Sequence, residues 1–183
     1  MTWHTVPSAP ATPAQIAAAE AALGCPIPDL LKTFYARHDG LLTFLASHVA
    51  AGDPGEPSTH LFGVASENLR LGGLISVDDE DNEFIDYIRE QHGPGVSPLA
   101  FETQEFSDWM GDIVEADGFP EGWLCIATNI QIHDTFWTPA RPDATIVCQL
   151  PSPRFAVDAD IRRALRDNRM PLEKWLRETL RGD

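Results

Sequence analysis

Residues 12–40 read TPAQIAAAEAALGCPIPDLLKTFYARHDG and contain the clearest structural signals in the chain. Thr12 followed by Pro13 and Gln15 is typical of a helix start, because Thr12 can cap the first turn and Gln15 stands at the capping-box position. Gly24 can supply the left-handed residue that ends such a helix. The apolar spacing predicts one buried face, made of Ile16, Ala19 and Leu23.

A second helix follows the turn at residues 25–28. Its apolar residues occur at core spacing and comprise Leu30, Leu31, Phe34 and Tyr35. The pair Asp39-Gly40 ends this helix, with Gly40 as the predicted left-handed residue. Two short helices joined by a tight turn cannot bury their apolar faces alone, so they must pack on a sheet or on further helices.

The rest of the chain contains predicted strands and helices without an internal repeat. Apolar runs predict strands at 61–64, 123–127, 135–137 and 144–150. Helical spacing predicts helices at 83–91 and 101–117, followed by two more that begin at an Asp158 cap and near Pro171. We therefore predict a single α+β domain over residues 1–183, in which residues 1–11 form a flexible N-terminal tail.

The signals in the N-terminal third combine into one longer pattern. It reads Ile16-x-x-x-Glu20-x-x-Leu23-Gly24-x-x-Ile27-Pro28, followed by Leu31, Phe34, Tyr35 and Asp39-Gly40. This pattern resembles the signature of the SUKH superfamily, with Ile27 in place of the usual Leu and Asp39 in place of Asn. Residues 119–127 are similar to the family's central strand, whereas residues 129–134 replace the Gly-Asp pair that usually follows.

The resemblance implies both a fold and a type of function. The fold is one SUKH-like domain, with a mixed or antiparallel sheet and helices packed around it. The superfamily includes a fungal cell-wall-assembly regulator and many bacterial immunity proteins, which typically neutralise a cognate polymorphic toxin, often a nuclease. We therefore expect a protein that acts by binding another protein and that is not an enzyme.

The charge of the chain is strongly asymmetric. Thirteen basic and 28 acidic residues leave a net charge of −15. Residues 53–121 contain 17 of the acidic residues and two basic ones, so this segment alone carries the whole surplus. A phosphate backbone needs lysine and arginine, which excludes nucleic acid as the expected partner. A basic protein surface, such as that of a nuclease toxin, is the expected partner instead.

Two acidic stripes are the predicted partner-binding residues. They consist of Glu105, Asp108, Asp112 and Glu115 on one helix, and Glu83, Asp86 and Glu90 on the preceding one. In the 101–117 helix the opposite face is apolar and comprises Phe106, Trp109, Met110 and Ile113. The alternative interpretation is an ordinary solvated helix surface. Like charges on adjacent turns repel each other, however, and that helix contains no lysine or arginine.

The sequence offers no pattern that is typical of catalysis or metal binding. His38-Asp39 and His133-Asp134 could form a metal or acid–base pair, but they lack a supporting motif. Cys25, Cys125 and Cys148 lack the spacing of a zinc or redox motif and are predicted to be buried, reduced thiols. We predict no catalytic residue, no metal and no cofactor.

The remaining predictions concern location and the aromatic residues. No apolar stretch approaches the roughly 18 residues of a membrane-spanning helix, and the N-terminus does not resemble a secretion signal, so we expect a cytoplasmic protein without membrane contact. The tryptophans that lie within apolar patterns are predicted to belong to the core, and they are Trp109, Trp123, Trp137 and Trp175.

Three functional hypotheses remain open from the sequence. The first is an immunity-type protein that blocks a toxin through its acidic face. The second is a regulatory or scaffold protein of the same fold. The third is an enzyme of an unrecognised type, which would require a pocket where His38 or His133 meets carboxylates.

Overall fold

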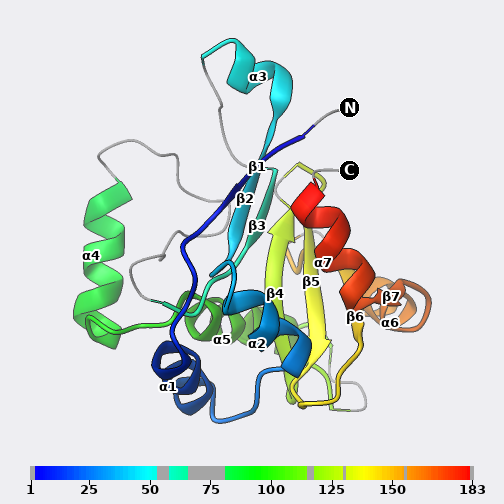
Figure 1. The fold of residues 1–183 in the computed structure, drawn as a ribbon. Coiled ribbons are helices and arrows are strands. Elements are labelled where there is room, and N and C mark those ends of the chain that lie inside the picture. The colour runs from blue at the N-terminus through cyan, green and yellow to red at the C-terminus, as the bar shows by residue number, and fades with distance from the viewer. Residues whose placement is uncertain are drawn as a thin grey trace.

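One antiparallel sheet organises the described part of the chain. The computed structural model describes residues 3–52, 58–65, 81–114, 118–129, 131–154 and 156–181, excluding the side chains of residues 81–85. Within these ranges seven strands follow one another across the sheet in chain order, each antiparallel to its neighbours (Figure 1). The strands are β1 (Trp3–Pro7), β2 (Leu41–Leu45), β3 (Thr59–Leu61), β4 (Trp123–Asn129), β5 (Asp134–Pro139), β6 (Ile146–Pro151) and β7 (Arg169–Pro171).

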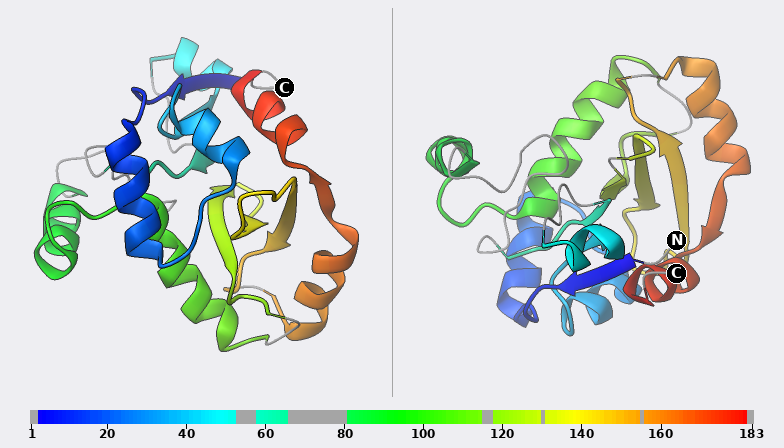
Figure 2. Two further views of the ribbon diagram at one scale, coloured as in Figure 1. Left: turned by 60° about the horizontal axis from the view of Figure 1, so that its bottom comes forward. Right: turned by 90° about the horizontal axis from the view of Figure 1, so that it is seen from above.

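Helices surround this sheet. They are α1 (Pro13–Leu23), α2 (Asp29–Tyr35), α3 (Ala46–Ala50), α4 (Asp81–His92), α5 (Pro98–Gly111), α6 (Asp158–Asp167) and α7 (Leu172–Arg181). Helix α5 packs against β4 and α1, α6 packs against β6 and β7, and α7 lies beside β1, β6 and β7 (Figure 2). None of the described helices is long and apolar enough to cross a lipid bilayer.

Both faces of the sheet contribute to the core. Consecutive strand residues point to opposite faces, so Phe136 and Trp137 on β5 are on different sides. Phe136 packs on Trp175 of α7 with ring centroids 5.0 Å apart, and Trp137 packs on Phe119 at 5.1 Å. The predicted α+β architecture with helices around a sheet is confirmed, and the sheet is antiparallel throughout the described strands.

Helix α1 begins and ends where its sequence predicts. Thr12 Oγ1 accepts a hydrogen bond from the Gln15 backbone N–H at 3.2 Å, and Gln15 Oε1 accepts one from the Thr12 N–H at 2.8 Å. The capping box therefore satisfies two N–H groups that the first turn cannot use internally. At the other end, Gly24 has a φ of 67°.

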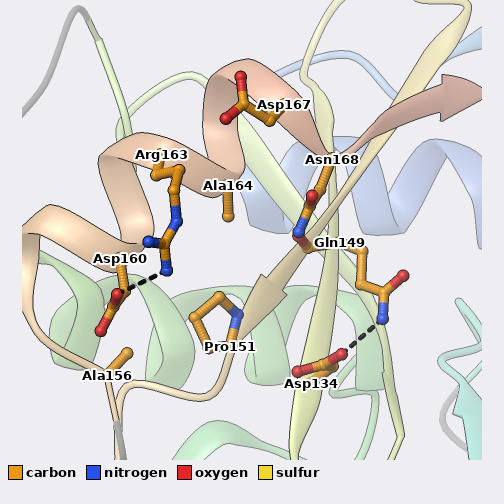
Figure 3. A pocket seen from close by; sticks show the side chains of 9 residues that line it. All are labelled: Asp134, Gln149, Pro151, Ala156, Asp160, Arg163, Ala164, Asp167 and Asn168. Carbon is orange, nitrogen blue, oxygen red and sulfur yellow. Dashed lines mark hydrogen bonds and ion pairs between the residues drawn. The ribbon is translucent and has the colours of Figure 1, made fainter.

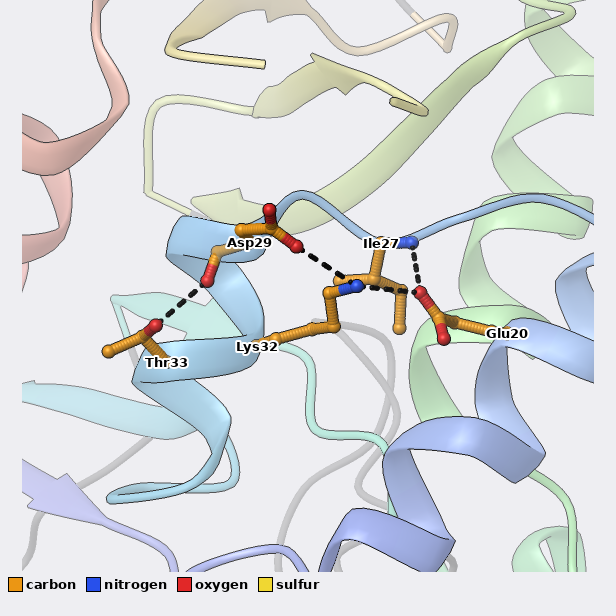
Figure 4. Close-up of polar contacts among 5 residues, drawn as sticks. All are labelled: Glu20, Ile27, Asp29, Lys32 and Thr33. Carbon is orange, nitrogen blue, oxygen red and sulfur yellow. Dashed lines mark hydrogen bonds and ion pairs between the residues drawn. The ribbon is translucent and has the colours of Figure 1, made fainter. Parts of the chain in front are cut away.

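The acidic residue of the SUKH-like pattern joins α1 to the turn before α2. Glu20 Oε1 accepts a hydrogen bond from the Ile27 backbone N–H at 2.9 Å and lies 3.3 Å from Lys32 Nζ (Figure 4). Lys32 also approaches Asp29 at 3.0 Å. The pattern therefore specifies how the two helices pack. These contacts explain the presence of Glu20 without a bound ligand.

The pair Asp39-Gly40 has a larger role than ending a helix. The buried Asp39 carboxylate accepts hydrogen bonds from the backbone N–H groups of Val64 at 2.6 Å and Ala65 at 2.8 Å. Gly40 has a φ of 83°, and a Cβ atom there would lie 2.6 Å from the Leu61 carbonyl oxygen. The two residues thus hold the chain after β3 against the end of α2.

Several predicted boundaries are corrected by the structure. The helix expected at 101–117 is α5, which begins at Pro98 because Ser97 Oγ caps it by accepting from the Ala100 N–H at 3.4 Å. It ends at Gly111, a residue with low helix propensity. The strand expected at 61–64 is β3 at Thr59–Leu61. Asp158 is the first residue of α6 instead of its cap, and it pairs with Arg162 at 2.8 Å.

The sequence patterns did not predict β1, β2, α3 or β7. Residues 3–7, expected within a flexible tail, form the edge strand β1, whose residues pair with β2 from Trp3 opposite Leu45 to Pro7 opposite Leu41. The expectation of a tail is therefore wrong for these five residues. A five-residue edge strand is stabilised by a partner about 40 positions away, and no local pattern reports that pairing.

Tyr35 occupies the centre of the packing beneath α2. Its side chain is fully buried, and its hydroxyl oxygen has no hydrogen-bond partner in the described part of the chain. Burial raises the pKa of this hydroxyl above its ordinary value, and the nearby Asp39 carboxylate raises it further. The native state therefore strongly favours the protonated, neutral ring.

We expect Tyr35→Phe to change how stability depends on alkaline pH. Below about pH 10 both the native and the unfolded chain keep this proton, so it does not change how the free energy of unfolding depends on pH. Above pH 10 the unfolded chain releases it and the native chain does not, so the free energy of unfolding falls by roughly 1.4 kcal/mol per pH unit. The variant lacks this contribution and should decline less steeply from pH 10 to 12, as measured by urea denaturation.

The matched control is Tyr87→Phe, because Tyr87 is 55% exposed. It should retain the wild-type pH profile. At pH 7, Tyr35→Phe should leave the free energy of unfolding unchanged or raise it, since the lost hydroxyl has no partner among the described residues. Identical profiles for wild type and Tyr35→Phe above pH 10 would contradict the prediction.

Candidate partner-binding site

The candidate site is the exposed side of α5. Buried residues on the other side of this helix define its packed face, and they include Leu99, Thr103 and Met110. The carboxylates of Glu105, Asp108 and Asp112 are exposed, as the helical period predicts. Glu115, the fourth residue of the predicted stripe, lies outside the described residues.

The charge on this side of α5 is not compensated locally. The helix contains no lysine or arginine, and Glu105, Asp108 and Asp112 have no ion pair with any residue that the structure describes. Asp108 Oδ1 accepts a hydrogen bond from Gln104 Nε2 at 2.8 Å, which orients the carboxylate without neutralising it. The basic residues of the C-terminal helices lie elsewhere, since Arg162 and Arg163 pair with Asp158 and Asp160 of their own helix.

The position of these acids within α5 is also unfavourable for the helix. Asp108 is in the last turn and Asp112 is the residue that follows the helix. The C-terminal end of a helix carries partial negative charge, so each carboxylate there costs about 0.3–1 kcal/mol. Helix stability therefore gives no reason for this arrangement, whereas recognition of a basic surface does.

Trp109 is the residue that the sequence prediction missed. It was expected in the core, but 44% of its surface is exposed. With about 100° of rotation per residue, Trp109 lies beside Glu105 and Asp112, one turn away on either side. Its inner edge packs on Phe106 with ring centroids 5.9 Å apart. The signal in the sequence is its position at the border of the apolar face, and that position leaves its burial undecided.

The other tryptophans follow the prediction to different degrees. Trp137 and Trp175 are buried, whereas Trp123 is partly exposed. Among these four tryptophans, Trp109 is therefore the one whose exposed indole has carboxylates beside it. Tryptophan is enriched at the centres of protein interfaces because it provides a large apolar area with little conformational freedom to lose.

The predicted stripe on α4 is placed on a separate helix. Asp86 and Glu90 are exposed, but Asp86 lies 3.5 Å from Arg89 and is partly neutralised. The side chain of Glu83 lies outside the described residues. Figures 1 and 2 show α4 at the periphery with its axis crossing that of α5, so the acids of α4 do not continue the α5 stripe along one line.

The histidine and cysteine residues do not assemble a catalytic or metal site in the described part of the chain. No group of three or more histidine, cysteine, aspartate or glutamate residues there is arranged to hold a metal ion. His38 packs edge-on against Phe34, and His133 is exposed in the turn before β5. Cys125 and Cys148 are buried free thiols whose pKa is raised by that burial, and Cys25 is partly exposed.

Comparison with known protein families identifies a family that matches most of the chain. The sequence model of the SMI1/KNR4 family (SUKH-1) matches residues 10–143. The matched segment runs from the residues before α1 through β5 and includes the whole of α5, whereas β6, α6, β7 and α7 follow it. No curated protein sequence matches the chain.

Proposed function

Since the chain belongs to the SMI1/KNR4 family (SUKH-1), we propose that it is an immunity-type protein that neutralises a cognate toxin by binding it directly. The family match supports a binding role, because bacterial relatives of this type typically act as toxin-neutralising partners. The proposed binding residues are Glu83, Asp86, Glu90, Glu105, Asp108, Asp112 and Glu115, with Trp109 added from the structure.

One observation carries this proposal: the exposed side of α5 combines uncompensated carboxylates with an exposed tryptophan. Glu105 and Asp112 flank Trp109 on the helix surface, and the apolar face of the helix points the other way. A ring of charge around an aromatic anchor is a common organisation of an interface, because the anchor contributes affinity and the charges select the partner. The surface therefore suits a basic protein.

A nuclease is the toxin class that best complements this surface. A nuclease must attract phosphate, so its substrate-binding face carries lysine and arginine. An acidic protein that docks on that face would exclude the nucleic acid both sterically and electrostatically. Association would be fast, because opposite charges steer the encounter of the two proteins.

The alternative function is a regulatory or scaffold protein of the same fold. The matched family also contains members of that kind, and the acidic side of α5 would serve a regulatory partner equally well. The two functions differ in the consequence of binding: an immunity protein abolishes the activity of its partner at a one-to-one ratio, and a scaffold does not. A toxin gene directly upstream of this gene would favour immunity.

The experiment that tests the proposal starts from the native host. The full-length chain is used to capture its partner, the bound protein is identified and purified, and its enzymatic activity is measured while the chain is titrated in. Complete inhibition at one equivalent is the expected result. A tight complex that leaves the activity of the partner unchanged would contradict the immunity function and favour the scaffold.

We expect Trp109→Ala to weaken the complex by roughly 30-fold or more, since truncation of a central interface tryptophan typically costs 2 kcal/mol or more. The dissociation constant is measured by calorimetry with the purified partner. Ile132→Ala is the control, because Ile132 is 55% exposed in the turn between β4 and β5. Equal affinities for wild type and Trp109→Ala would remove Trp109 from the interface.

A further inference from the structure

A hollow lies between the sheet and α6, on the opposite side of the molecule from α4 (Figures 1 and 2). Its volume is about 420 Å³, at the lower end of the range of about 300–1,000 Å³ for sites that hold a small group. Figure 3 shows two polar pairs facing each other across Pro151. One pair comes from the strands β5 and β6, and the other comes from α6.

Each polar pair is joined by a hydrogen bond or ion pair. On the sheet side, Gln149 Nε2 donates to Asp134 Oδ2 at 2.5 Å. On the helix side, Arg163 Nη2 lies 2.8 Å from Asp160 Oδ1. Asp134 and Gln149 are half-buried, and the backbone around Asn168 is bonded to Gln149, whose N–H donates to the Asn168 carbonyl at 3.1 Å. The walls of this hollow are thus held in place by contacts within the fold.

The hollow carries a net negative charge. Its lining includes three carboxylates, from Asp134, Asp160 and Asp167, and one cation, Arg163. The ion pair with Arg163 neutralises Asp160, and neither Asp134 nor Asp167 has an ion pair with any described residue. The hollow therefore offers the Asp134 carboxylate together with the amide oxygens of Gln149 and Asn168 as hydrogen-bond acceptors, and the exposed Asp167 adds negative charge at its edge (Figure 3).

Most of the lining of the hollow lies outside the segment that matches the family. The family match ends at residue 143, and of the lining residues Asp134 alone lies within it. Gln149 on β6 and the residues of α6 belong to the segment that follows the matched region.

We propose that this hollow binds an arginine side chain of the protein partner, as a second contact in addition to the acidic side of α5. The inference rests on the proposed protein-binding function. A guanidinium group is planar and has five N–H donors, so one group can reach Asp134 and the acceptors of Gln149 or Asn168 together. The net negative charge of the lining disfavours a carboxylate or phosphate as the occupant.

The test uses the full chain and a short probe, so that it does not depend on the identity of the toxin. The probe is the peptide Gly-Gly-Arg-Gly-Gly, acetylated and amidated, and the readout is the change in backbone amide NMR shifts on titration. Saturable shifts confined to residues 134, 149 and 160–168 are expected. The same peptide with citrulline in place of arginine, which has a similar shape without the charge, should bind at least tenfold more weakly.

The variant Asp134→Asn/Asp167→Asn should also weaken the arginine peptide at least tenfold. Its control is Glu173→Gln, an exposed acid on α7 that does not line the hollow. Retained NMR dispersion shows whether each variant is folded. If the double variant is unfolded, the single variant Asp167→Asn replaces it in the test, because Asp167 is exposed.

Three results would overturn the inference: no saturable shifts at these residues, equal binding of the citrulline peptide, or tighter binding of putrescine than of the arginine peptide. The last result would assign the hollow to a free polyamine. None of them depends on the acidic side of α5. A failure of toxin neutralisation with intact arginine binding would count against the proposed function alone.

Discussion

Replacing Glu105, Asp108 and Asp112 by lysine should slow association with the partner by roughly 10–10³-fold at low ionic strength. The three changes alter the local charge by six units on one exposed helix side that carries no compensating cation. The long-range attraction to a basic surface then becomes repulsion, so fewer encounters lead to binding. The association rate constant is measured by stopped-flow fluorescence at two salt concentrations.

The salt dependence separates this effect from a loss of direct contacts. The Debye length falls from about 30 Å at 0.01 M to about 10 Å at 0.1 M ionic strength, so the difference between wild type and variant should shrink as salt is added. The dissociation rate should change less than the association rate, because steering acts before the complex is formed.

A control triple with the same change in net charge tests whether position matters. Asp143, Glu173 and Glu178 lie outside α4 and α5, and their replacement by lysine also adds six units of charge. This control should slow association far less than the α5 triple. Equal slowing by both triples would show that net charge alone steers the encounter, and the acidic side of α5 would no longer be the docking surface.

The second large effect is expected for stability. Asp39→Ala should lower the free energy of unfolding by about 3–5 kcal/mol, because it removes the acceptor of two backbone N–H groups at Val64 and Ala65. Leaving each buried N–H group without an acceptor costs about 1–3 kcal/mol, and hydrogen bonds to a charged acceptor are the stronger kind. Guanidinium denaturation followed by circular dichroism measures the change.

Two further variants define the cause of that loss. Asp39→Asn keeps the shape of the side chain and one amide oxygen, so it should lose less stability than Asp39→Ala. Asp143→Ala removes an exposed aspartate and should change stability by less than about 0.5 kcal/mol. If Asp39→Ala costs under 1 kcal/mol, the contacts with Val64 and Ala65 do not stabilise the fold as inferred here.

The family likeness and the core packing of the N-terminal third could be predicted because their signals are local. The capping box of Thr12 and Gln15 and the left-handed residues Gly24 and Gly40 act within one or two turns of the chain. The apolar residues of α2 show their packing in their own spacing, and Leu31, Phe34 and Tyr35 are buried as predicted. The C-terminal helices α6 and α7 likewise show their buried faces in the spacing of their apolar residues.

The candidate site was predictable in part for the same reason. Glu105, Asp108 and Asp112 are exposed because they stand opposite an apolar face, and that relation is present in the sequence. Trp109 was misassigned because a residue at the border of an apolar face is buried or exposed according to what packs beside it. Whether Trp109 is covered depends on the neighbours of α5, which the local pattern does not contain.

The sequence by itself determined the helix starts and ends, the apolar faces, the asymmetric charge and the resemblance to a family. The tertiary structure alone decided that residues 3–7 pair as an edge strand, that Asp39 holds Val64 and Ala65, and that β6 and α6 enclose an acidic hollow. The physical reason is the range of the interactions. Capping and helical period act over a few residues, whereas strand pairing, buried polar contacts and cavities join segments that are distant in the chain.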